Sequence, residues 1–197
     1  MNVELIKQAD SLNQLLHNMI FTYGSEPKRE ISSPDLQTCH HKVIDSIKQT
    51  KQHGGAVYII GNGGSAAIAS HAKTDFMNVN GVRAITLLEP AIMTCLSNDN
   101  GYDTVFSRQI STLARKQDTL IAISSSGNSA NIINAVDAMK QVGGVIISLS
   151  GFERDNRLRT KGDFNYWIDS KSYMLVEIAH LFVLHYLADF MNTSIKV

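Results

Sequence analysis

The sequence is poor in residues that cross-link a fold or divide it into pieces. Of its 197 residues, two are cysteine and three are proline. Cys39 and Cys95 lie far apart without a Cys-x-x-Cys spacing, so we expect two buried free thiols in a reducing compartment. The chain has no low-complexity tract and no proline-rich linker, and its length fits one domain. We therefore predict a single domain over residues 1–197.

The sequence also lacks an excess of charge of either sign. Acidic and basic residues number 18 each, whereas a nucleic-acid-binding surface needs a basic patch or stripe. We find no run of about 18 apolar residues, the length that a membrane-spanning helix requires. The first ten residues lack the basic and apolar regions of a signal peptide. We expect a cytoplasmic protein that binds neither nucleic acid nor membrane.

The sequence does contain a regular alternation of apolar strands and amphipathic helices. Strands that are apolar throughout, separated by helices, indicate a parallel sheet covered on both faces. We predict an α/β fold: a doubly wound, five-stranded parallel sheet flanked by helices, with a helical N-terminal extension over 1–53. The predicted strands are 56–61, 83–88, 119–124, 144–150 and 164–169, and the predicted helices are 3–22, 34–52, 65–78, 91–97, 102–116, 129–142 and 172–192.

Two of the predicted strand-to-helix turns are rich in glycine and serine: GNGGS (61–65) and SSSGNSAN (124–131). In an open parallel sheet, ligands bind beyond the carboxyl ends of the strands. Glycine lets backbone N–H groups approach a ligand, and a helix N-terminus favours an anion. Neither turn has a P-loop lysine or a GxGxxG pattern, so one phosphate monoester fits better than a nucleotide. A single such turn would be an ordinary connection, with Ser65 and Ser129 as helix caps, but two together favour a phosphate site.

A second group of candidate residues combines imidazoles with carboxylates. His71 and Asp75 are four residues apart on one predicted helix, so they share a face. The last predicted helix carries Glu177, His180 and His185, of which Glu177 and His185 can flank one stripe. Such groups suit Zn²⁺ or another divalent first-row metal. Each histidine taken alone is more often a hydrogen-bonded core residue, and spacing alone does not bring the two helices together.

The motifs GNGGSAAIASH, LSNDNGYDTVFSRQI and ISSSGNSANII resemble those of the sugar isomerase (SIS) domain family. From about residue 35 onward the chain is most similar to phosphoheptose isomerases, which interconvert sedoheptulose 7-phosphate and D-glycero-D-manno-heptose 7-phosphate. The resemblance implies a flavodoxin-like sheet, a homotetramer with active sites shared between subunits, and one zinc ion per subunit. It maps a zinc-linked catalytic group onto His71, Asp75, Glu177 and His185. It maps substrate contacts onto Asn62, Gly63, Gly64, Asn98, Asp99, Ser124, Ser125, Ser126 and Ser129, to which we add Ser65 of the first turn.

The chain departs from the family pattern in several places. Asp75 stands where the family usually has glutamate, and Glu177 where it has glutamine. Val79 replaces an arginine, and residues 66–68 replace a His-Cys-Asp sequence. Shortening a base by one methylene matters, because a displacement near 1 Å costs about a hundredfold in rate. We expect a divergent subgroup that acts on a related phosphosugar in surface-polysaccharide synthesis.

The reaction hypothesis is proton transfer through an enediol. The phosphate of an open-chain ketose binds the 124–129 turn, and Asp75 or, alternatively, Glu177 takes the proton next to the carbonyl. His185 donates to the carbonyl oxygen, while Asn98 and Asp99 fix sugar hydroxyls. Two alternatives stay open. One is a non-catalytic module that binds a phosphosugar or a protein such as a replication initiator; the other is an isomerase or lyase of another sugar phosphate.

The N-terminal helix carries an apolar stripe with two interpretations. It covers the core of its own chain, or it packs against another subunit. The family resemblance favours the second, and oligomer formation is the expectation. The stripe consists of Leu5, Leu12, Leu15, Leu16 and Met19.

Overall fold

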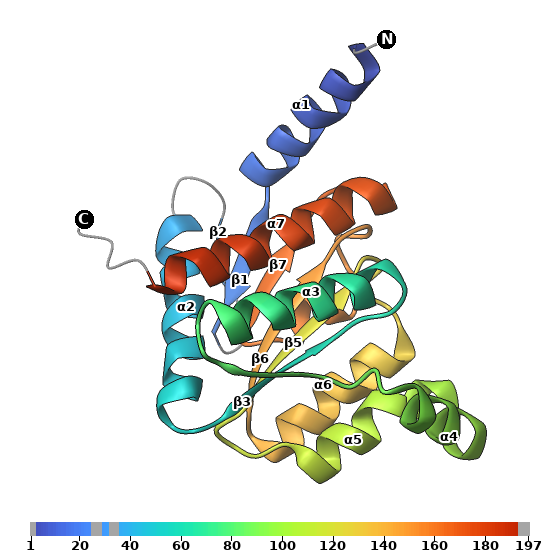
Figure 1. The fold of residues 1–197 in the computed structure, drawn as a ribbon. Helices are drawn as coiled ribbons and strands as arrows, with labels where there is room; N and C mark the ends of the chain where they lie inside the picture. Colours follow the sequence, from blue (N-terminus) through green and yellow to red (C-terminus); the bar gives the residue numbers. More distant parts are fainter. Residues whose placement is uncertain (1–2, 25–28, 32–35, 193–197) are drawn as a thin grey trace.

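The fold was described from a computed structural model, which describes residues 3–24, 29–31 and 36–192. This part of the chain forms seven strands and seven α-helices, whose arrangement is shown in Figure 1. The strands are β1 (Ile20–Tyr23), β2 (Arg29–Ile31), β3 (Ala56–Ile60), β4 (Arg83–Thr86), β5 (Thr119–Ser124), β6 (Val145–Ser150) and β7 (Phe164–Trp167). The helices are α1 (Val3–His17), α2 (Leu36–Gln52), α3 (Gly64–Asn78), α4 (Pro90–Asn100), α5 (Val105–Leu113), α6 (Ala130–Val142) and α7 (Tyr173–Asn192), with short 3-10 turns at Tyr102–Thr104 and Leu158–Thr160.

The five predicted parallel strands form the body of one sheet. The sheet order is β2-β1-β7-β6-β5-β3-β4, and each pairing among β3 to β7 is parallel. Counted along the chain from β3, these strands lie in the order 2-1-3-4-5, which is the flavodoxin-like doubly wound order. The predicted fold is therefore confirmed. The strand order reverses between β3 and β5, so the two glycine- and serine-rich turns flank the switch point.

The sheet has more strands than the sequence predicts, because residues 20–23 and 29–31 add two antiparallel strands. A helix over 3–22 was expected, but α1 ends at His17, and β1 pairs with β7 and β2. Phe21 is fully buried and packs edge-on against Tyr166 at a ring-centroid distance of 4.8 Å. The sequence analysis did not predict this strand because its partner β7 lies about 140 residues away along the chain. Local periodicity does not reveal so distant a pairing.

Helices cover the two faces of the sheet. Helices α2, α3 and α7 pack on one face and α5 and α6 on the other, while α1 projects away from the body (Figure 1). The core strands alternate accordingly: Val57 and Ile59 point to the first face, and Tyr58 and Ile60 to the second. Helix α7 is long and apolar enough to cross a membrane, but nearly half of it is buried among α3, α2 and the sheet. Its burial is that of a core helix.

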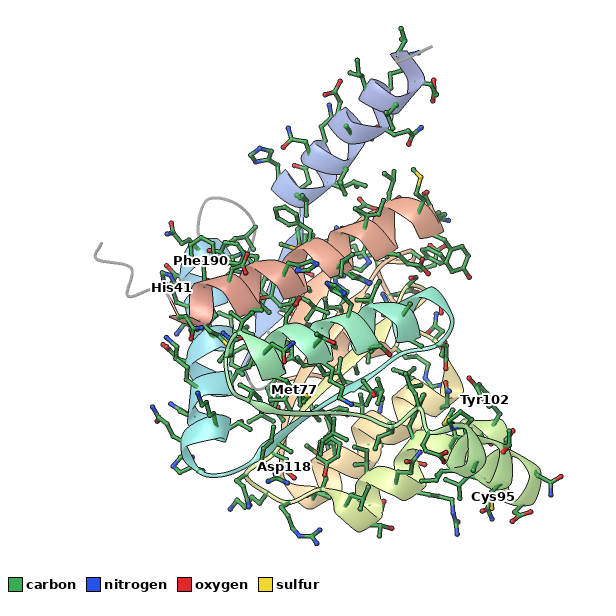
Figure 2. The ribbon with its side chains drawn as sticks, viewed as in Figure 1. His41, Met77, Cys95, Tyr102, Asp118 and Phe190 are labelled. Carbon is green, nitrogen blue, oxygen red and sulfur yellow. The ribbon has the colours of Figure 1, made fainter. Side chains whose placement is uncertain are left out.

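One of the two cysteines differs from its prediction. Cys39 is buried, but Cys95 is exposed on α4 (Figure 2), where its Sγ lies 3.5 Å from Asp99 Oδ2. The hydrogen bond to Asp99, followed by the charge of that carboxylate, raises the pKa of the Cys95 thiol. Neither cysteine forms a disulfide.

His180 of α7 is a core residue, as a lone histidine on an apolar helix more often is. It is fully buried, and its Nε2 lies 3.1 Å from the Ser150 carbonyl oxygen. Burial lowers the pKa of His180 to about 4, against the weaker opposing effect of the Ser150 carbonyl. The His180 imidazole is therefore protonated near pH 6.5 in the unfolded chain, but only near pH 4 in the folded chain.

This difference predicts a loss of stability in mild acid. Between pH 7 and pH 5, His180 should lower the free energy of unfolding by about 2 kcal/mol, because protons then favour the unfolded state. His40, whose pKa burial also lowers to about 4, acts in the same direction. Urea unfolding of the native chain and of a His180→Gln variant at both pH values measures the effect. An equal fall in the two proteins would contradict the assignment to His180.

Candidate active site

A small cavity lies at the carboxyl end of β5. Its volume is about 140 Å³, and most of its lining groups are polar. The second turn supplies four hydroxyls to it, the first turn supplies Asn62 and Ser65, and α7 supplies a carboxylate and a phenol ring. The lining residues are Asn62, Ser65, Ile123, Ser124, Ser125, Ser126, Ser129, Tyr173 and Glu177.

The hydroxyls of the second turn make only local hydrogen bonds among the described residues: Ser124 Oγ accepts from Gly127 N–H at 3.2 Å, and Ser126 Oγ accepts from Asn128 N–H at 3.3 Å. Ser129 occupies the N-cap position of α6, but its side chain makes no capping bond there. Its Oγ instead accepts a bond of 3.3 Å from Ser124 Oγ. Ser125 Oγ is buried and has no hydrogen-bond partner among the described residues. A buried hydroxyl without a partner costs about 1–3 kcal/mol, so Ser125 carries a donor that an additional group could satisfy.

The first turn is occupied by a side chain of the protein. Gly63 has a φ of 53° and precedes α3, as the glycine-rich pattern predicts for a tight strand-to-helix turn. A Cβ placed on Gly64 would overlap the carboxylate of Glu177. The absence of a side chain at Gly64 therefore admits this carboxylate to the N-terminus of α3, where the helix dipole favours negative charge. Gly63 and Gly64 do not line the cavity.

Asn62 is fixed by an amide network. Its side chain exchanges two hydrogen bonds of 2.8 and 2.9 Å with Asn131 of α6, so it ties the first turn to the second. The hydroxyl of Tyr102 donates a third bond of 3.0 Å to Asn62 Oδ1. Tyr102 lies at the end of the molecule near α4 (Figure 2). The side chain of Asn62 thus links the first turn both to the start of α6 and to the segment after α4 by hydrogen bonds.

A second cluster lies where α3 and α7 pack together. Asp75 Oδ2 is 3.0 Å from His185 Nδ1 and 3.7 Å from His71 Nε2. The two imidazole rings meet edge to face at 4.8 Å. One ligand atom from each residue lies within 4.8 Å of the other two. The fold, rather than the spacing, brings these three predicted residues to one place, and two imidazoles with a carboxylate are a donor set that a divalent metal accepts.

Within the described part of the chain, Glu177 lies outside this cluster, although the predicted metal ligands included it. It lies eight residues before His185, about 12 Å along the helix axis, and its carboxylate meets Gly64 instead. The predicted four-ligand set is thus divided: three ligands stand together, and Glu177 faces the serine-lined cavity.

Asn98 and Asp99 are likewise placed apart from the cavity. Both are exposed on α4, and their side chains bond to each other at 2.8 Å. Neither lines the cavity within the described part of this chain. Conversely, Tyr173 lines the cavity but was not predicted. Its spacing of four residues before Glu177 is the one signal in the sequence that could have found it, since residues i and i+4 share a helix face.

The model of the SIS domain matches residues 35–151, which is more than half of the chain. The chain belongs to the SIS domain family. Within the family it is similar to proteins named phosphoheptose isomerase: it is 30% identical to that of Helicobacter pylori (strain P12) over 185 residues, 90% of this chain and 94% of the relative. It is 43% identical to that of Sodalis glossinidius over 112 residues, 54% of this chain and 58% of the relative.

Solved structures of this SIS group share the fold. Phosphoheptose isomerase GmhA from Neisseria gonorrhoeae superposes with a TM-score of 0.76 at 25% identity, covering 96% of this chain and 94% of that one. A phosphoheptose isomerase from Francisella tularensis gives a TM-score of 0.77 at 22% identity, with 96% of each chain covered. These relatives support a sugar-phosphate isomerase, a class that the two clusters of polar residues suit.

Proposed function

We propose that this SIS protein is an aldose–ketose isomerase of a phosphosugar, with sedoheptulose 7-phosphate as the preferred substrate and D-glycero-D-manno-heptose 7-phosphate as the product. The observation that carries the proposal is a cavity lined by four serines of one turn, of which Ser125 has a buried hydroxyl without a hydrogen-bond partner among the described residues. Neutral hydroxyl donors next to a helix N-terminus suit a phosphate group. The proposed place of action is the cytoplasm, where phosphosugars are made.

The two clusters divide the work between binding and proton transfer. The serine turn holds the phosphate, and Asn62 is fixed beside it. Asp75 takes the proton from the carbon next to the carbonyl, and His185, which bonds Asp75 at 3.0 Å, donates to the carbonyl oxygen. Glu177 accepts hydrogen bonds from sugar hydroxyls and is the alternative base. No redox cofactor is needed, because the electrons move only between neighbouring carbons.

His71, Asp75 and His185 would hold a divalent metal, for which zinc is our proposal. The fit rests on the mutual approach of their ligand atoms to within 4.8 Å and on the nitrogen and oxygen donors that zinc prefers. When bound, such an ion supplies Lewis-acid polarisation of a substrate oxygen. Three protein ligands leave a position open, as in catalytic rather than structural zinc sites.

We further propose a homotetramer whose subunits share active sites. The side chains of His71 and His185 are 55% and 41% exposed, which leaves the cluster open in one chain. Exposed apolar side chains follow the same surface, including Ile178 and Phe182 on α7. Helix α1 carries exposed Leu5, while its Leu12, Leu15 and Leu16 are partly buried against the core of their own chain. A second copy that covers these groups would also bring Asn98 and Asp99 to a neighbouring site.

The function is tested with a panel of five- to seven-carbon ketose and aldose phosphates in D2O, followed by NMR. We expect interconversion of sedoheptulose 7-phosphate with the heptose 7-phosphate and uptake of deuterium at the carbon next to the carbonyl. Conversion of a different sugar would correct the substrate but keep the reaction class. Binding without conversion of any member of the panel would refute the isomerase and favour a phosphosugar-binding module.

Ser125→Ala should separate binding from stability. Removing a hydroxyl that has no partner leaves the free energy of unfolding unchanged or slightly raised, but it removes a donor to the phosphate. Hydrogen bonds to charged groups contribute about 1.5–3 kcal/mol, so the Kd for inorganic phosphate should rise about tenfold or more. Calorimetric titration with phosphate and urea unfolding measure the two quantities.

Ser148→Ala is the matched control for this substitution. Ser148 is also fully buried, but its Oγ bonds Asn165 Oδ1 at 2.7 Å, away from the cavity. We expect it to lose about 1 kcal/mol of stability and to bind phosphate normally. A Ser125→Ala protein that is destabilised while binding phosphate as tightly as before would contradict the phosphate site.

A further inference from the structure

The side-chain amide of Asn62 lies in the cavity wall with most of its hydrogen-bonding capacity already in use. Its Oδ1 accepts from Asn131 Nδ2 at 2.8 Å and from the Tyr102 hydroxyl at 3.0 Å. Its Nδ2 donates to Asn131 Oδ1 at 2.9 Å. An amide oxygen offers two lone pairs and an amide nitrogen two protons. One N–H of Asn62 Nδ2 is therefore the part of this side chain that no described residue pairs, and it is available to a ligand.

The sense of this amide pair is set by a backbone group that can only donate. The N–H of Ile132 lies 3.0 Å from Asn131 Oδ1 and 3.1 Å from the Ser129 carbonyl oxygen. Because a backbone N–H cannot accept, it selects the oxygen of Asn131 for this position and leaves Asn131 Nδ2 to face Asn62 Oδ1. An Asn62 amide turned over would oppose nitrogen to nitrogen and oxygen to oxygen. Asn62 is therefore held with a donor left for the cavity.

Tyr102 restrains the same amide from another part of the chain. It lies in the short turn after α4, 40 residues beyond Asn62 in the sequence, near the end of the molecule (Figure 2). Its hydroxyl can donate or accept, so Tyr102 does not by itself set the sense of the amide. Its bond instead fills the second lone pair of Asn62 Oδ1. A ligand in the cavity therefore meets only a donor on this side chain.

From this network we propose that Asn131 and Tyr102 are positioning residues that fix Asn62 as a donor, and that Asn62 held in this way gives the cavity its preference for a charged phosphate oxygen. The inference rests on the proposed function, since it takes the cavity as the phosphate site. The serine hydroxyls can turn to donate or to accept, so they suit neutral and charged oxygens alike. A fixed N–H binds a charged oxygen about twice as strongly as a neutral one, whereas an amide free to turn would also present its oxygen, which repels the phosphate.

The experiment measures the Kd for inorganic phosphate by calorimetric titration in the native chain and in two variants of the positioning residues. Tyr102→Phe removes only the exposed hydroxyl, and Asn131→Leu replaces the amide with an apolar group of similar size. We expect the Kd to rise about threefold in Tyr102→Phe and about tenfold in Asn131→Leu, because a loosened Asn62 spends less time as a donor.

Asn134→Ala is the matched control. Asn134 also ties α6 to the turn after α4, since its Nδ2 donates to the Asp103 carbonyl at 2.9 Å, but it has no bond to Asn62. The Kd for phosphate should stay within about twofold of the native value. A rise in Asn134→Ala as large as that in Tyr102→Phe would show that the tie between the two segments matters and not the amide, and would overturn the inference.

Two further readouts show whether the effect passes through Asn62. In an Asn62→Ala background, Tyr102→Phe should leave the Kd unchanged, because the group that it positions is gone. The two proton signals of the Asn62 amide, assigned by their loss in Asn62→Ala, should respond differently to phosphate in NMR spectra of the native chain. The free N–H should shift, and the N–H bonded to Asn131 should move little.

The outcomes separate this inference from the proposed function. A native chain that binds phosphate, with an unchanged Kd in Tyr102→Phe and no shift of either Asn62 signal, would overturn the positioning role and keep the phosphate site. Additive losses in the Asn62→Ala background would overturn it as well. A native chain that binds no phosphate would refute the proposed function instead. If Asn131→Leu does not fold, Tyr102→Phe decides, since it changes an exposed side chain.

Discussion

Asp75→Asn should lower kcat for the heptose phosphate by about a thousandfold. A positioned base contributes roughly 10²–10⁴ to the rate, and an amide cannot take the proton. The Oδ2 atom of Asp75 also lies close to both histidines of its cluster, 3.0 Å from His185 Nδ1 and 3.7 Å from His71 Nε2. Phosphate binding should be unaffected, because Asp75 does not line the serine cavity. Steady-state kinetics and phosphate titration measure the two effects.

Two comparisons make the Asp75→Asn result specific. Asp45→Asn removes an exposed carboxylate on α2 and should leave turnover as it is. Assays at saturating zinc show whether the loss is only one of metal affinity, since added metal would then restore the rate. Undiminished turnover in Asp75→Asn, together with a large loss in Glu177→Gln, would transfer the role of base to Glu177.

The sequence predicted the fold well where the structure depends on local pattern. Five strands that are apolar throughout could only be buried on both faces, and the helices between them enforced parallel pairing. The serine turn was predictable for the same reason, since its place after a buried strand fixes the edge of the sheet that it occupies. Strand β1 was missed because it forms by pairing with β7, far away along the chain, where Phe21 packs against Tyr166.

The candidate site was predictable only in part. The residues of the serine turn lie where the sequence put them, and a resemblance, not spacing, grouped His71, Asp75 and His185. The division of Glu177 from these three could not be foreseen, because it depends on the packing of α3 against α7. Tyr173 was missed for a similar reason: an aromatic residue at a helix start gives no signal of a site until the fold brings it to the cavity.

The first glycine turn forms where the sequence predicts it, but its glycines are needed for a different reason than expected. Gly61, Gly63 and Gly64 were expected to leave bare backbone for a ligand phosphate. At Gly61 a Cβ would collide with the Ser65 backbone, so that glycine is needed for the turn itself. At Gly64 the space is taken by the Glu177 carboxylate. The anion that this turn accommodates is a side chain of the protein, so the serine turn is the proposed phosphate site.

This assignment makes Gly64→Ala a variant that should lose activity without losing stability. Gly64 has an ordinary helical φ, so alanine fits its backbone and favours the helix by up to about 1 kcal/mol. The added Cβ occupies the place of the Glu177 carboxylate, whose flexible side chain can move aside at little cost in folding energy. A displacement of about 1 Å in a functional group costs up to a hundredfold in rate. We expect kcat/KM to fall roughly 10–100-fold with an unchanged or higher melting temperature.

A double-mutant cycle with Glu177→Gln tests whether the effect passes through this carboxylate. If Gly64→Ala acts only by displacing Glu177, it should change kcat/KM little in the Glu177→Gln background, so the two losses will not add. Additive losses would mean that Gly64→Ala disturbs the turn itself, for instance the paired amides of Asn62 and Asn131. Full activity in Gly64→Ala would show that the reaction does not depend on the position of Glu177, and Asp75 would remain the one candidate base.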